Sequence, residues 1–400
     1  MSSQSAAADA EGAPAGFAAA APPAPHRRVP ALDGVRGLAI VLVLVYHCAK
    51  FPKHTELGVF LASLRSVCWG GVDLFFVLSG FLITGVLLDA RGRANYYRNF
   101  YVRRVLRIFP LYYGVLAAVF VGIPVLLAVA DWQPGPRWMV LWERLQDRQI
   151  WLWAYLQNFV QAEGPKALPS FGPFWSLAIE EQFYMVWPFV VALAPRRQLR
   201  WIILAGCLMG PLLRLGLILN GWSTWAVYHI TPTRLDGLLF GAFAAVLVRD
   251  ATPVPARTLR LAATLCVAAI TGLMLTLGNF STHWEAVSVS GYALLAILFT
   301  SGLLLLVQGQ VGPRTRAVFE SRTLTMFGKY SYAIYVFHWP IARWARHTFV
   351  TSDLGMAVRD YVVLVPLAVF LFVTVMVLLL AKLSWVLWES RWLRLKSRFS

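Results

Sequence analysis

Long runs of apolar residues alternate with short polar links along most of the chain. A helix needs about 17–25 apolar residues to cross the roughly 30 Å hydrocarbon core of a bilayer. Ten stretches have about this length, several of them interrupted by polar residues: 36–52, 70–89, 105–130, 174–194, 200–219, 233–249, 258–277, 287–308, 327–344 and 359–388. The pattern predicts an all-α fold, a polytopic membrane helix bundle of about ten transmembrane helices.

The regions outside these stretches differ in composition. Residues 1–25 are mostly Ala, Ser, Pro and Gly, which cannot bury enough surface to fold. We therefore expect a disordered cytoplasmic tail over 1–28, a membrane domain over 29–390 and a basic cytoplasmic tail over 391–400. Residues 149–161 are apolar and rich in Trp and Tyr but too short to cross, so we expect an interfacial or re-entrant segment there.

The overall charge supports a membrane protein. Only 14% of the residues are charged and 58% are hydrophobic, whereas a soluble domain carries about a quarter charged residues. The net charge of +17 would suggest a nucleic-acid partner in a soluble protein. In a membrane protein it indicates basic loops on the cytoplasmic side, so we expect contact with membrane lipids and none with nucleic acid.

Basic residues are concentrated in every second link between the apolar stretches. These links precede the first stretch and follow the second, fourth, sixth, eighth and tenth: 27–28, 91–104, 196–200, 249–260, 314–329 and 391–398. The positive-inside rule makes them cytoplasmic and puts both termini inside. The weakest point of this assignment is the first outer loop, which carries Lys50, Lys53 and Arg65.

Two ionisable residues share a face of the first apolar stretch. Arg36 and His47 are eleven residues apart, or three helical turns plus about 20°, with about 16 Å between them along the axis. A snorkelling arginine and a hydrogen-bonded core histidine would explain each residue alone. Their shared face on an otherwise apolar helix favours a lined cavity.

Further charged residues point to chemistry at two depths. Glu180 lies about 9 Å below the outer end of its stretch, a depth similar to that of His47, and a carboxylate near a histidine can orient a catalytic base. For Glu181 we favour a helix-locking hydrogen bond. Arg104 and Arg107 are three residues apart, so they either clamp one phosphate group or only set the topology.

Four other polar residues leave two interpretations open. Asp73 lies near the outer end of the second stretch, and Arg234 and Asp236 lie near the outer start of the sixth. Arg234 and Asp236 form either a mutual ion pair or acceptor contacts. His338 either lines the cavity or satisfies a neighbour near the Pro340 break. The chain has no metal-ligand spacing and no nucleotide-binding glycine motif, so we expect no metal.

Together these motifs resemble the acyltransferase-3 family of integral membrane O-acyltransferases, over about residues 30–345 and in the family's order. Any one motif is weak, but six in order are specific. They are Leu32-Asp33-Gly34-Val35-Arg36-Gly37 with His47, 71–84, 103–110, 175–184, Arg234-Leu235-Asp236-Gly237 and 332–340.

The resemblance implies transfer of an acyl group, often acetyl, from cytoplasmic acyl-CoA to an acceptor hydroxyl. His47 would be the catalytic histidine, with direct transfer or a covalent acyl-histidine both open. Arg36, Arg104 and Arg107 would hold the CoA end, and Glu180 and Asp73 would support the centre. Some relatives carry a second, esterase-like domain, for which this chain has no room. We therefore expect transfer to finish in the membrane domain or to pass to a separate protein.

The acceptors of similar proteins are extracytoplasmic glycans and sometimes macrolide-type small molecules, and the resemblance implies the bacterial inner membrane. We expect a glycan, with His47 as general base. Two other classes would also need many helices with buried charges: a transporter or flippase of lipid-linked sugars, and an inactive partner in a glycan-assembly complex. The sequence does not identify the acceptor, the acyl length or the oligomeric state.

Overall fold

A computed structural model of the chain describes residues 29–131, 135–351 and 362–399. These residues fold into helices, and none of them forms a strand. The α-helices are α1 (Pro30–Cys48), α2 (Glu56–Ser66), α3 (Gly71–Ala90), α4 (Tyr96–Ala117), α5 (Ile123–Val129), α6 (Pro136–Asp147), α7 (Gln149–Trp153), α8 (Gln157–Gln161), α9 (Trp175–Leu193), α10 (Arg196–Leu219), α11 (Thr224–His229), α12 (Leu235–Arg249), α13 (Ala256–Leu277), α14 (Tyr292–Val307), α15 (Pro313–Phe319), α16 (Arg322–Thr351), α18 (Leu364–Ser384) and α19 (Ser390–Leu395). The predicted all-α fold is confirmed for this part of the chain.

Within the described ranges, seven helical segments are long and apolar enough to cross a membrane. They are Pro30–Cys48, Glu56–Ala90, Tyr96–Val129, Arg196–Leu219, Ala256–Leu277, Val287–Val307 and Leu364–Leu395. The stretches predicted at 174–194, 233–249 and 327–344 are the helices α9, α12 and α16, which are not among these seven. The helix α12 has only 15 residues. The protein is thus a multi-pass membrane helix bundle, but ten spans are not confirmed.

The structure also bears on the segments predicted to lie outside the spans. Residues 149–161 form α7 and α8, each of five residues, so this segment does not span. The predicted disordered tail over 1–28 lies outside the described residues, as do positions 359–361 of the last predicted stretch. The predicted basic tail begins as the helix α19 and continues as a 3₁₀ turn over Lys396–Arg398.

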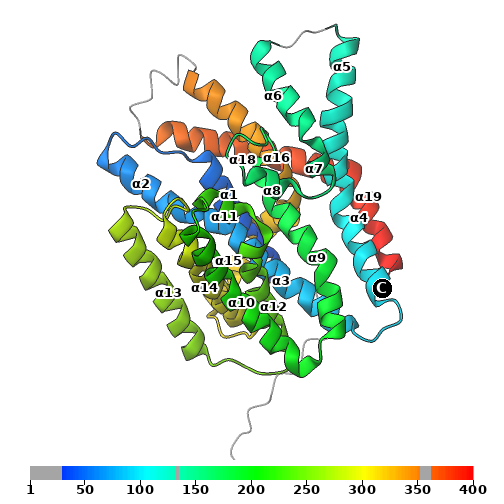
Figure 1. Cartoon of the computed structure of the whole chain (residues 1–400), viewed down its shortest axis with the longest axis vertical. Helices are drawn as coiled ribbons and strands as arrows, with labels where there is room; N and C mark the ends of the chain where they lie inside the picture. Colours follow the sequence, from blue (N-terminus) through cyan, green and yellow to red (C-terminus); the bar gives the residue numbers. More distant parts are fainter. Residues whose placement is uncertain (1–28, 132–134, 352–361, 400) are drawn as a thin grey trace, which may run out of the picture.

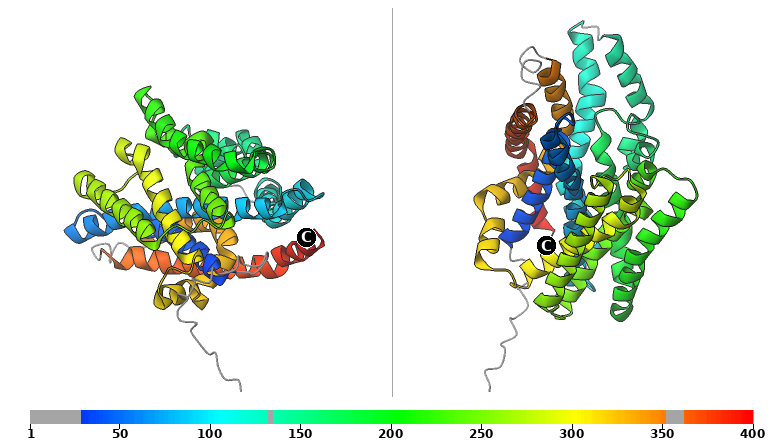
Figure 2. Two further views of the ribbon diagram at one scale, coloured as in Figure 1. Left: turned by 90° about the horizontal axis from the view of Figure 1, so that it is seen from below. Right: turned by 90° about the vertical axis from the view of Figure 1, so that its left-hand side faces the viewer.

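The centre of the bundle is a row of closely packed helices. The helix α1 packs on α16 and α3, α3 packs on α12, and α12 packs on α10. On one side of this row lie α13 and α14, and on the other lie α4 and α19, as Figure 1 shows. The helices α5 and α6 project beyond the remaining helices (Figures 1 and 2).

Glycines bring the two central helix pairs together. A Cβ atom on Gly37 would collide with the carbonyl oxygen of Leu324, and one on Gly328 with that of Asp33, so α1 and α16 meet backbone to backbone. Gly80 faces the Leu238 carbonyl of α12 in the same way. Small residues allow such contacts between membrane helices, where packing and not water drives association. The close fit fixes the position of α16 relative to the ionisable face of α1.

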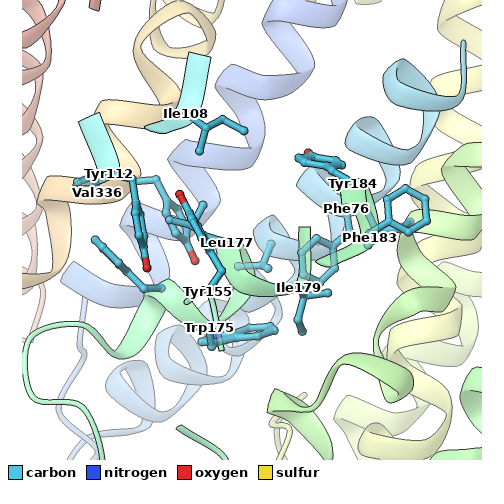
Figure 3. Packing of buried hydrophobic residues seen from close by; sticks show 14 of the residues in the cluster. Phe76, Ile108, Tyr112, Tyr155, Trp175, Leu177, Ile179, Phe183, Tyr184 and Val336 are labelled. Carbon is cyan, nitrogen blue, oxygen red and sulfur yellow. The ribbon is translucent and has the colours of Figure 1, made fainter. Parts of the chain in front are cut away.

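An aromatic core packs α4 against α9 and the 149–161 segment (Figure 3). The rings of Tyr112 and Tyr155 stack with their centroids 4.2 Å apart, and Trp175 and Phe183 belong to the same buried cluster. The Tyr112 hydroxyl donates a hydrogen bond of 2.7 Å to the Leu152 carbonyl. These contacts hold α9, which carries two glutamates, beside the arginines of α4.

Candidate active site

Two cavities lie along the ionisable face of α1. The first, of about 110 Å³, is lined by Arg36, Arg104 and Arg107, and we call it the arginine cavity. The second, of about 290 Å³, is lined by His47, His229 and His283, and we call it the histidine cavity. The face shared by Arg36 and His47 therefore borders two cavities and not one.

The arginine cavity is formed where α1, α3, α4 and α9 converge. Arg36 donates a hydrogen bond of 3.2 Å to Asp33 one turn earlier. The Arg104 guanidinium lies over the Tyr184 ring, 5.4 Å from its centroid. The Tyr184 hydroxyl is in turn hydrogen bonded to Ser79 of α3. Packing and hydrogen bonds thus hold two of the predicted phosphate-binding arginines in defined positions.

Two carboxylates share this cavity with the arginines. Glu180 and Glu181, both on α9, belong to its lining, and Glu181 is buried. The lining therefore combines three arginines with two glutamates. Glu180 therefore lies with the predicted phosphate-binding arginines. The sequence analysis had instead assigned it to orienting His47.

The C-terminal segment adds positive charge next to the arginine cavity. The helix α19 packs beside α4 (Figure 1), and Arg103 donates a hydrogen bond to the Phe399 carbonyl. Beyond the last apolar segment, burial and the repulsion of Arg107, Arg104, Arg103 and Arg36 lower the pKa of Lys396 to about 8. Such repulsion indicates a cluster of cations without enough acidic partners.

His47, which lines the histidine cavity, is paired with a second histidine, His338, which is in the lining of neither cavity. The Nδ1 atom of His47 lies 3.0 Å from the Val43 carbonyl oxygen and 3.3 Å from the Nε2 atom of His338. The Nδ1 atom of His338 lies 2.6 Å from the Tyr335 carbonyl oxygen. His338 is fully buried on α16, the helix that packs closely on α1.

These contacts assign the protons on both rings. A carbonyl oxygen only accepts, so the ring nitrogen facing it must carry the hydrogen. His338 therefore donates from Nδ1 to Tyr335 and presents a lone pair at Nε2. His47 donates from Nδ1 toward Val43 and His338, which leaves a lone pair on its Nε2 atom. A neutral histidine of this tautomer is ready to accept a proton or to attack a carbonyl carbon.

The structure does not bring Glu180 to His47. Glu180 lines the arginine cavity and His47 lines the histidine cavity, and within the described residues the hydrogen-bond partner of the His47 ring from another helix is His338. A similar depth in the sequence did not imply contact, because the two residues line different cavities. His338 occupies the orienting position that the sequence had suggested for Glu180.

Tyr335 and Val72 line both cavities and separate them. The Tyr335 hydroxyl donates a hydrogen bond of 2.6 Å to the Pro173 carbonyl. Because that hydroxyl has one hydrogen, the Ser176 hydroxyl, also 2.6 Å away, is the donor toward Tyr335. A molecule reaching from one cavity into the other passes this boundary.

Asp73, Arg234 and Asp236 line neither cavity. Arg234 pairs with Asp73 at 2.8 Å, and Asp236 pairs with Arg214 at 2.8 Å. The mutual ion pair of Arg234 and Asp236, one of the two alternatives from the sequence, is therefore replaced by two other ion pairs. All four side chains are at most 2% exposed. The Arg234 guanidinium also lies 3.9 Å from the Tyr292 ring centroid. Asp73, Arg214, Arg234 and Asp236 thus form a buried network of two ion pairs outside both cavity linings.

Sequence reasoning passed over several residues at these sites. Arg214 is a charge within an apolar span, five residues before its end at Leu219, a signal that could have identified it. The histidine cavity is also lined by Lys50, Arg65 and Arg343, of which the first two had appeared only as exceptions to the topology rule. Among the described residues, no three His, Cys, Asp or Glu side chains are grouped to hold a metal.

Comparison with known proteins identifies the class. The chain belongs to the acyltransferase-3 family, because the family's model, an acyltransferase domain, matches residues 29–385. The resemblance inferred from the motifs is confirmed, and with the seven apolar helices it makes the protein an integral membrane acyltransferase.

Several curated bacterial proteins are similar to this chain. Peptidoglycan O-acetyltransferase OatA of Listeria monocytogenes is 28% identical over 345 residues, covering 79% of this chain and 50% of its own length. The putative peptidoglycan O-acetyltransferase YrhL of Bacillus subtilis is 29% identical, covering 79% and 49%. A putative O-acetyltransferase of Staphylococcus aureus is 27% identical, covering 83% and 54%. The chain spans about half the length of these relatives. No solved structure matches it significantly.

Proposed function

We propose that this protein transfers an acetyl group from acetyl-CoA to a hydroxyl of an extracytoplasmic glycan, with His47 as general base. The observation that carries the proposal is the pair of contacts at the Nδ1 atom of His47, to the Val43 carbonyl and to His338, which leaves the Nε2 lone pair available at a cavity. Relatives named O-acetyltransferases support acetyl as the group and peptidoglycan-like glycans as the acceptor class.

The arginine cavity suits the CoA end of the donor. CoA carries several phosphate groups, and arginine forms charge-assisted, often bidentate hydrogen bonds to phosphate. Arg36, Arg104 and Arg107 provide three such donors, and repulsion from them contributes to the lowered pKa of Lys396. The positive-inside rule applied to the basic links at this end of the bundle supports a cytoplasmic position for the cavity, on the side where acyl-CoA is found.

The distance between the cavities suits an extended donor. Arg36 and His47 are about 16 Å apart along α1, a span that the pantetheine arm of CoA can cover with its phosphates held at the arginines. The thioester would then lie at the boundary formed by Val72 and Tyr335, facing His47. Donor and acceptor would thus meet from opposite sides of the membrane.

The chemical step follows from the His47 tautomer. The Nε2 atom of His47 takes the proton of the acceptor hydroxyl while the hydroxyl oxygen attacks the thioester carbonyl carbon. The C–S bond breaks as the ester C–O bond forms, and the thiolate leaves as free CoA after taking the proton back from His47. The imidazolium formed on the way shares its Nδ1–H with Val43 and His338. General-base catalysis of this kind contributes about 10²–10⁴-fold.

The test is a transfer assay with purified protein in liposomes. Radiolabelled acetyl-CoA is supplied with cell-envelope glycan, and both label in the glycan and free CoA are measured. The proposal expects equal amounts of both products. CoA release with label on a small hydroxylated molecule would replace the glycan by a macrolide-type acceptor. No acetyl-CoA binding and no CoA release would overturn the proposed donor.

A further inference from the structure

The histidine cavity has an unusual charge for the outer end of a membrane protein. Its lining includes Lys50, Arg65 and Arg343 and contains no Asp or Glu. The arginine cavity, by contrast, has two acidic residues in its lining, Glu180 and Glu181, beside its three arginines. A cavity with three cations and no acid in its lining has a positive potential that attracts anions.

Arg65 is held in place without an acidic partner. Its Nη1 atom donates a hydrogen bond of 2.6 Å to the Tyr46 carbonyl, and its guanidinium lies 5.1 Å from the Tyr46 ring centroid. Its Nε atom is buried and has no hydrogen-bond partner within the described part of the chain. Arg65 is half-buried, and no acidic side chain among the described residues pairs with it, so its charge at the cavity lining is available to an anionic group of a ligand.

Lys50 and Arg343 lie at the exposed edge of the same cavity. Among the described residues neither side chain forms a hydrogen bond or an ion pair with an acid. Lys50, Lys53 and Arg65 are also the residues that weaken the topology assignment, because basic residues in short outer loops run against the positive-inside rule. Binding of an anion would explain why Lys50 and Arg65 are found there.

The other walls of the cavity are aromatic. Trp225, Tyr228 and Trp339 belong to its lining, and the His47 ring packs edge-on against Trp339 with centroids 5.0 Å apart. Aromatic faces offer apolar surface for the C–H face of a sugar ring, while hydroxyl and indole N–H groups hydrogen bond to its edge. The cavity combines such faces with cations and the available Nε2 atom of His47.

We propose that the histidine cavity binds an anionic glycan, with a carboxylate or phosphate of the sugar held by Lys50, Arg65 and Arg343 and a hydroxyl directed to His47. The proposal rests on the proposed function for the role of His47 and extends it to the substrate class. Neutral sugars of the same size would occupy the aromatic walls but leave the cations unpaired.

The test is a binding assay that requires no catalysis. Quenching of tryptophan fluorescence in the purified full-length protein is measured with three tetrasaccharides: cellotetraose, its C6-carboxylate form and its 6-phosphate form. We expect at least one charged form to bind about tenfold or more tightly than the neutral one, and the tighter charged form identifies the group. This difference should disappear in the Lys50→Ala/Arg343→Ala variant, because within the described residues neither Lys50 nor Arg343 forms an ion pair that the fold would lose.

Lys53→Ala is the matched control, because Lys53 lies in the same loop but not in the cavity lining. It should keep the preference for the charged sugar, and Lys50→Arg should keep it too. Equal binding of charged and neutral sugars, no binding of either, or an equal loss in Lys53→Ala would overturn the proposal. Binding of a charged sugar without acetyl transfer would count against the proposed function alone.

Discussion

The Nε2 atom of His338 lies 3.3 Å from the Nδ1 atom of His47, although 291 residues separate the two histidines in the chain. The close packing of α1 on α16 brings them together. Because His338 is fixed by the Tyr335 carbonyl, it accepts from His47 and keeps the opposite ring nitrogen of His47 unprotonated. The pair replaces the carboxylate that orients histidine in many hydrolases.

The first prediction concerns His338 as a positioning residue. His338→Ala should lower kcat about tenfold with little change in the KM of acetyl-CoA, since only the orientation of the base is lost. His338→Gln should recover part of this loss because its amide oxygen can accept the same hydrogen bond. A pH–rate profile should shift in both variants. An unchanged profile with a lower kcat would indicate a merely structural role.

The second prediction separates donor binding from acceptor binding. Arg104→Ala removes one charge-assisted contact and should weaken acetyl-CoA binding about 10–100-fold, corresponding to about 1.5–3 kcal/mol. Lys396→Ala should weaken it less, because Lys396 lies beside the cavity and not in its lining. Arg197→Ala, an exposed arginine outside the cavity lining, is the control. Equal effects of Arg104→Ala and Arg197→Ala would show that the net charge of the protein, and not a specific site, sets the affinity for acetyl-CoA.

The third prediction concerns the buried ion pairs. Asp73→Asn leaves Arg234 charged in a buried position and should lower the free energy of unfolding by about 3–5 kcal/mol. Asp89→Asn is the matched change in the more exposed Asp89–Arg249 pair and should cost at most about 1 kcal/mol. Thermal unfolding in detergent measures both. A stable Asp73→Asn protein with impaired acceptor binding would restore the direct role first suggested by the sequence.

The fourth prediction is a pH dependence of acceptor binding. Lys50 follows the end of α1, and partial burial with the repulsion of Arg346 and Arg65 lowers its pKa to about 8. Besides Arg65, the cavity lining contains the charged or titratable groups Arg343, His47, His229 and His283. Below pH 8 the ammonium is charged and attracts an anionic sugar, and above it the charge and the affinity fall.

This pH effect is measured with the charged tetrasaccharides in the absence of acetyl-CoA, because Lys396 has a similarly lowered pKa at the other cavity. Affinity should drop between pH 7 and pH 9 in the unaltered protein and stay level in Lys50→Arg, which remains charged across that range. A parallel drop in both proteins would assign the effect to another group.

Much of the fold could be read from the sequence, because apolar length and helical periodicity are local properties. The helix containing Arg36 and His47, the pair Arg104 and Arg107, and the non-spanning 149–161 segment follow from spacing alone. Partners across helices could not be read. Asp73 pairs with Arg234, 161 residues away, and His47 pairs with His338. Both pairings depend on which faces of the helices pack together.

The outer cations show a second limit of sequence reasoning. Lys50 and Arg65 appeared as weak exceptions to the positive-inside rule, a rule that describes insertion and does not consider ligands. Only the folded arrangement shows that they line one cavity with His47. An exception to a topology rule near an ionisable helix face is therefore itself a signal of a binding site.

The central claim is that His47 accepts the proton of the acceptor, and its most direct test is acetyl transfer by His47→Ala beside His283→Ala. Both histidines line the same cavity, but only His47 is oriented by His338. The account predicts that His47→Ala binds acetyl-CoA normally and loses transfer by at least about 10²-fold, whereas His283→Ala retains most of it. Near-normal transfer by a folded His47→Ala protein would contradict it.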